Sequence, residues 1–67
     1  MNNLIQSAKN EVVKTNNKFG YVAGDLEIAA DIWHGYLTVE QRLEIMKNNN
    51  ITKSVKDAYK AVADMMK

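Results

Sequence analysis

Apolar side chains recur along this chain at intervals of three and four positions, which is the spacing of one face of an α-helix. Four segments carry the pattern. The first runs from about Asn3 to Lys14, and its apolar face is formed by Leu4, Ile5, Ala8, Val12 and Val13. The Asn16-Asn17 pair that follows is a stop signal and ends this helix in the prediction. Apolar and polar residues alternate nowhere over a strand length, so the pattern predicts an all-α fold.

The second segment is apolar over a wider arc than contact with one neighbouring helix requires. It begins at Asp25, a residue type that favours the N-cap position. One apolar stripe consists of Leu26, Ala29, Ala30, Trp33 and Leu37, and an adjacent stripe of Ile28, Ile32 and Tyr36. Such a helix lies at the centre of a bundle, or it also contacts another chain.

Caps mark the last two helices. Thr38-Val39-Glu40-Gln41 has the form of a capping box, and the run Asn48-Asn49-Asn50 ends the helix that it opens. Its predicted buried stripe is Val39, Leu43 and Met46, with Ile45 flanking. Thr52 or Ser54 caps the last helix, and its predicted core stripe is Val55, Tyr59, Val62 and Met66. Residues 1–67 are therefore expected to form a single domain, a small bundle of three to four short helices.

Composition narrows the chemistry that this chain can perform. The 67 residues contain no cysteine and one histidine, His34, so thiolate and multi-histidine metal sites are excluded within one chain. No glycine-rich phosphate loop is present, and neither Ser7 nor Ser54 stands in a turn that would activate a nucleophile. We therefore expect a protein that is not an enzyme and that needs no metal or cofactor.

The hydropathy of the chain gives an expectation about its location. No apolar run approaches the roughly 20 residues that span a membrane. The first residues lack the basic and long apolar regions of a secretion signal. A cytoplasmic protein with no membrane partner is therefore expected.

The net charge of +1 is unevenly distributed along the chain. Residues 19–40 contain four acidic side chains and no lysine or arginine, whereas residues 41–67 contain six basic and three acidic side chains. Strong nucleic-acid binders have a larger basic excess, so this pattern favours self-association or a charge-complementary partner. Abundant asparagine and lysine, whose codons are rich in A, together with the small size are typical of a bacteriophage protein.

Candidate contact residues gather on the second helix and the loop before it. The loop from Lys18 to Gly24 carries two aromatic residues, which either cover the edge of the core or form an exposed recognition loop. Trp33 is an anchor for a partner or the centre of the core. The candidate partner-binding set is Phe19, Tyr21, Trp33, Tyr36, Glu27, Asp31 and His34.

The last three members of that set allow a second interpretation. Glu27, Asp31 and His34 stand at i, i+4 and i+7 and share one face of the helix. With ligands from a second chain they would suit a divalent cation. The simpler interpretation is a solvated polar face on which Asp31 hydrogen-bonds His34, so no metal site is predicted.

These patterns predict a small non-catalytic regulator that binds another protein and blocks it sterically. We expect this chain to be a phage-type inhibitor or adaptor of a host factor. We also expect it to form a homodimer. The alternative is a helix-turn-helix-like DNA-binding regulator whose reading helix begins near Thr52. Its nucleic-acid-binding residues would be Lys53, Ser54, Lys56 and Lys60. Asp57 in their midst argues against it. A structural subunit of a larger assembly is a third possibility.

Overall fold

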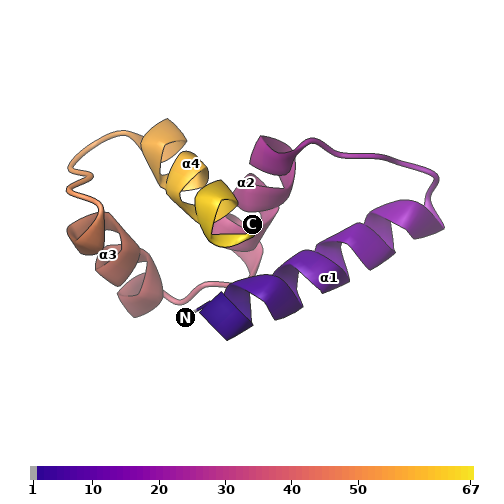
Figure 1. Ribbon diagram of the computed structural model, residues 1–67, viewed down its shortest axis with the longest axis horizontal. Helices are drawn as coiled ribbons and strands as arrows, with labels where there is room; N and C mark the ends of the chain where they lie inside the picture. The colour runs from indigo at the N-terminus through magenta and orange to yellow at the C-terminus, as the bar shows by residue number, and fades with distance from the viewer. Residues whose placement is uncertain (1) are drawn as a thin grey trace.

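The computed structural model describes residues 2–67, and within this range the chain forms helices and no strand. The helices are α1 (Asn2–Lys18), α2 (Asp25–Gly35), α3 (Val39–Asn48) and α4 (Val55–Met65). They form a body of 35 × 20 × 20 Å (Figure 1). The predicted all-α bundle of short helices is confirmed.

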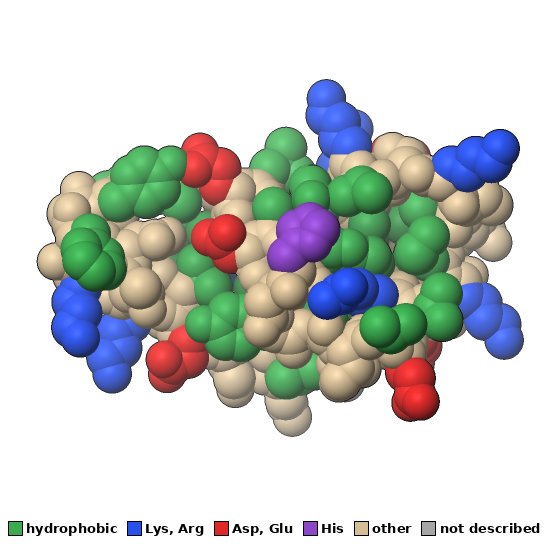
Figure 2. Space-filling view, turned by 180° about the vertical axis from the view of Figure 1, so that it is seen from behind, with side chains coloured by type: hydrophobic (Ala, Val, Ile, Leu, Met, Phe, Trp, Pro, Cys, Tyr) green, Lys and Arg blue, Asp and Glu red, His purple; other side chains and the backbone are tan. Residues whose placement is uncertain are grey.

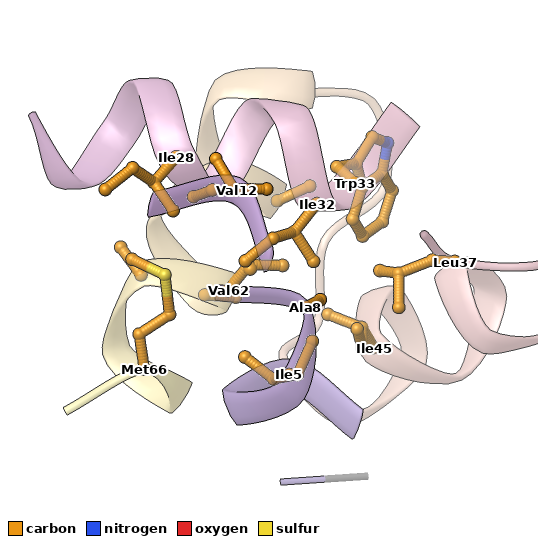
Figure 3. Packing of buried hydrophobic residues seen from close by; sticks show 14 residues of the cluster. Ile5, Ala8, Val12, Ile28, Ile32, Trp33, Leu37, Ile45, Val62 and Met66 are labelled. Carbon is orange, nitrogen blue, oxygen red and sulfur yellow. The ribbon is translucent and has the colours of Figure 1, made fainter. Parts of the chain in front are cut away.

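Helix α2 is central because it packs against both α1 and α4, whereas α3 lies at one end of the long axis (Figure 1). The loop between α1 and α2 lies at the opposite end. Ile5 of α1, Ile32 of α2 and Val62 of α4 are completely buried where these three helices meet. Figure 3 shows them within one apolar cluster, with Leu37 and Ile45 on the side of α3.

Helix α1 is longer than its sequence pattern predicted. It runs through Asn16-Asn17 to Lys18, so the assignment of that pair as a stop signal was wrong. The helix ends in a Schellman motif. The Tyr21 N–H donates to the Asn16 carbonyl oxygen at 2.9 Å, and the Gly20 N–H donates to the Asn17 carbonyl oxygen at 3.1 Å. Gly20 adopts φ = +71°, a left-handed conformation that only glycine reaches without strain.

The caps of the other helices agree with the sequence in two cases of three. In the predicted capping box the Thr38 N–H donates to Gln41 Oε1 at 2.8 Å, and the Gln41 N–H donates to Thr38 Oγ1 at 3.1 Å. Ser54 caps α4, since its hydroxyl accepts the Asp57 N–H at 3.2 Å. Asp25 is the first residue of α2 and not its N-cap, which is Gly24.

The prediction was wrong about which face of α3 is buried. Ile45 is only 2% exposed, whereas Val39 and Leu43 of the expected stripe are 66% and 59% exposed. The first core position expected in α4, Val55, is likewise half exposed. Helix α3 lies at the end of the bundle and contacts the core on one side only. The side that faces the core is the one that carries Ile45, and the centre of the apolar arc faces away from it.

Candidate protein-interaction surface

The six residues 19–24 between α1 and α2, here called the aromatic loop, expose apolar side chains to solvent. Phe19 is 81% exposed, Val22 89% and Tyr21 50%. Of the two interpretations of this loop, the structure has the exposed one, since the aromatic rings do not cover the core. Figure 2 shows hydrophobic side chains at this end of the molecule with acidic and basic side chains beside them.

Hydrogen bonds link the first half of the aromatic loop to both α1 and α2. The Schellman motif at Gly20 fixes its departure from α1. On the other side, the Tyr21 hydroxyl donates a hydrogen bond to the carboxylate of Glu27 in the first turns of α2. This hydrogen bond and the negative charge of Glu27 raise the pKa of Tyr21 above its usual value, with a smaller contribution from Asp31. A loop ordered before binding loses less conformational entropy when it contacts a partner.

Two hollows lie beside the aromatic loop. The larger, of about 170 Å³, opens between α1 and α2, and the residues that line it are Val12, Thr15, Asn16, Asp31 and Tyr36. The smaller, of about 60 Å³, lies against the loop itself and is lined in part by Tyr21, Val22 and Ile28. Pockets that hold a small molecule usually measure about 300–1,000 Å³. Both hollows are smaller than this.

Five of the predicted contact residues lie on this end of the molecule. Phe19, Tyr21, Glu27, Asp31 and Tyr36 are all exposed, and Tyr36 is 42% exposed beside the larger hollow. They come from the aromatic loop and from the α2 face next to it. Among them, Tyr21 is hydrogen-bonded to Glu27, and Asp31 and Tyr36 line the same hollow. The basic side chain of Lys18, next to Phe19, is exposed as well.

Trp33 and His34 do not belong to this surface. Trp33 is 6% exposed and packs in the core, which is the second of the two positions considered for it (Figure 3). His34 Nε2 lies 2.6 Å from the hydroxyl oxygen of Tyr59 in α4, and their rings meet edge to face. The expected partner of His34, Asp31, is therefore replaced by Tyr59.

The three residues considered for a cation do not form a site. The Glu27 carboxylate is hydrogen-bonded to Tyr21, and His34 is hydrogen-bonded to Tyr59. Within residues 2–67 no three acidic or histidine side chains converge on one point that would hold a metal ion. The polar face of α2 instead forms hydrogen bonds to its neighbours, to the aromatic loop through Glu27 and to α4 through His34.

Sequence reasoning missed two apolar residues of this surface. The sequence pattern does not mark Val22 as a contact residue, because it lies in the loop between Gly20 and Gly24, outside any periodic pattern. Leu26 was assigned to the core stripe of the second helix but is 44% exposed. The signal for Val22 was its position within a loop already marked by two aromatic residues.

The residues of the nucleic-acid alternative lie at the start of α4. Lys53, Lys56 and Lys60 are exposed, while the Ser54 hydroxyl is engaged as the helix cap. The connection between α3 and α4 spans the six residues 49–54. Helix-turn-helix motifs have a turn of about three to four residues. The spacing of α3 and α4 is therefore not that of this motif.

Comparison with other proteins adds no further candidate. No protein-family model matches the chain, and searches of curated proteins and of solved structures find no match. Over residues 2–67 no helix combines the length and the apolar character that crossing a membrane requires.

Proposed function

We propose that this protein is a small non-catalytic regulator that binds another protein through the aromatic loop and the adjoining face of α2. Its action is steric, because a surface that covers part of a partner excludes the partner's other ligands. A protein that acts in this way is either an inhibitor or an adaptor of its partner.

The exposure of Phe19 and Val22 is the observation that carries the proposal. Both side chains are more than four-fifths exposed, although apolar residues of this size gain free energy when they are removed from water. Single exposed apolar residues are ordinary, but here Phe19, Tyr21 and Val22 follow one another in a loop held by hydrogen bonds. Aromatic anchors on an ordered loop are typical of the centre of a protein interface.

The charges around the loop indicate what kind of surface it fits. Asp25, Glu27 and Asp31 follow the loop on α2 and are exposed, while the exposed Lys18 directly precedes the loop on α1. A partner with an apolar hollow and lysine or arginine at its rim would complement this arrangement. Charges at the rim of an interface act mainly on the rate of association, whereas burial of Phe19 and Val22 would contribute to the affinity.

The test is capture of partners from a cell lysate by the tagged full chain, with and without nuclease, for three forms of the protein. The original chain is compared with Phe19→Asp and with the control Lys56→Glu, which changes an exposed residue at the start of α4. We expect a protein partner that survives nuclease, that Phe19→Asp loses, and that Lys56→Glu retains. Circular dichroism establishes that each variant keeps its helices.

Other results would contradict the proposal in distinguishable ways. Capture of the same partner by a folded Phe19→Asp variant would exclude the aromatic loop as the site. Loss of every partner on nuclease treatment, together with loss in Lys56→Glu, would favour the nucleic-acid alternative on α4. In that case affinity would also fall steeply with salt, since phosphate contacts release counterions.

A further inference from the structure

The outward face of α3, at the opposite end of the molecule from the aromatic loop, is apolar and uncovered by its own chain. Val39 and Leu43, one helical turn apart, are 66% and 59% exposed. Met46 continues the same stripe but is only partly exposed, because it also packs against the core, and Val55 at the start of α4 is half exposed. Figure 2 shows several hydrophobic side chains between the histidine, near the middle of the view, and this end of the molecule. This stripe of Val39, Leu43 and Met46 is here called the α3 stripe.

Opposite charges stand at the two ends of one flank of the α3 stripe. Glu40 and Lys47 are seven residues apart, so they lie on the same side of the helix, and both are exposed. On the other flank, Arg42 is turned toward its own chain, where Nη2 donates a long hydrogen bond of 3.5 Å to the His34 carbonyl oxygen. Glu44, the remaining charged residue of α3, is exposed and lies farther from the stripe.

We propose that the α3 stripe binds a second copy of this chain, with the two α3 helices antiparallel across a two-fold axis. An axis perpendicular to both helices sets each flank beside the same flank of the other copy. The first turn of one α3 then lies beside the last turn of the other. Glu40 of each copy therefore faces Lys47 of the other, and Val39 faces the Met46 end of the opposite stripe. The helix is complementary to itself in both charge and apolar character.

This arrangement agrees with the position of α3 in the fold. Only Ile45 among its residues is buried, so pairing would cover an element that its own bundle leaves half open. Two helices of ten residues give a small interface, below the roughly 1,200 Å² in total that marks stable complexes. We therefore expect a weak dimer. The aromatic loops would point away from the pair, so the proposal does not depend on what those loops bind.

Sedimentation velocity of the full chain from about 10 µM to 1 mM tests the proposal at the concentrations where weak interfaces associate. We expect a monomer–dimer equilibrium in the original chain and at least a tenfold weaker one in Leu43→Asp. The control is Val22→Asp, which places the same charge on an even more exposed apolar residue at the far end. It should dimerise as the original chain does. A monomer at every concentration, or a dimer that Leu43→Asp keeps and Val22→Asp loses, would overturn the proposal.

Charge reversal tests the antiparallel geometry separately. Glu40→Lys and Lys47→Glu each place like charges opposite one another in their own homodimer, so each alone should dimerise several-fold more weakly. Mixing the two variants restores both opposite-charge pairs in a heterodimer, and the mixture should associate as strongly as the original chain. A mixture that dimerises no better than either variant alone would exclude this pairing. Circular dichroism of each variant shows that α3 is still formed.

Discussion

Gly20 and Gly35 predict opposite effects of the same substitution. Gly20 adopts φ = +71° at the end of α1, whereas Gly35 is the last residue of α2 and shows no such left-handed backbone. A Cβ atom built at either position would meet nothing within 4 Å. Steric contact is therefore absent in both cases, and only the backbone conformation distinguishes Gly20→Ala from Gly35→Ala.

The magnitudes follow from that difference. An L-residue in the left-handed region costs roughly 1–2 kcal/mol, and the lower entropy of the unfolded chain offsets part of this cost, so Gly20→Ala should destabilise the fold by about 1 kcal/mol. Alanine is favoured over glycine by about 0.8–1.0 kcal/mol inside a helix, and about half of that applies at a helix end. Gly35→Ala should therefore stabilise the fold by roughly 0.5 kcal/mol.

Thermal denaturation followed by circular dichroism at a fixed protein concentration measures both variants. In a domain of this size about 1 kcal/mol corresponds to a change of roughly 4–8 °C in Tm, so the two variants should separate clearly on either side of the original chain. A neutral or stabilising Gly20→Ala would refute the Schellman motif that positions Phe19 and Tyr21.

Further predictions concern the cap, the core and the loop. Thr38→Ala removes one half of the capping box and should cost about 1 kcal/mol in urea denaturation, while Thr38→Ser should cost much less. Ile32→Ala leaves a cavity at a completely buried position and should cost roughly 2–5 kcal/mol, enough to abolish the thermal transition; an unchanged Tm would contradict the packing. Glu27→Gln should lower the pKa of Tyr21, measured as tyrosinate absorbance against the same titration of Tyr21→Phe. Because folding raises this pKa, the stability from the Tyr21–Glu27 contact should be lost as pH rises through it.

The candidate surface was predictable in part. Two glycines, Gly20 and Gly24, and two aromatic residues marked the aromatic loop, and the acidic residues after the loop were identified with it. What the pattern left open was whether Phe19 and Tyr21 turn inward, and that depends on the course of α1 beyond Asn17. The signal for the end of α1 was Gly20, the glycine of the Schellman motif. The Asn16-Asn17 pair is also a stop signal, and it comes earlier in the chain.

The sequence by itself determined the helices and most of their ends. The Thr38–Gln41 box and the Ser54 cap join residues three positions apart, so their hydrogen bonds require no partner from another helix. Only the tertiary structure decided which apolar residues are buried. Trp33 and Leu43 both lie on apolar arcs, yet Trp33 is in the core and Leu43 is in solvent, because α2 has neighbours on two sides and α3 lies at the end. Periodicity marks an apolar face, and the positions of other helices determine whether anything covers it.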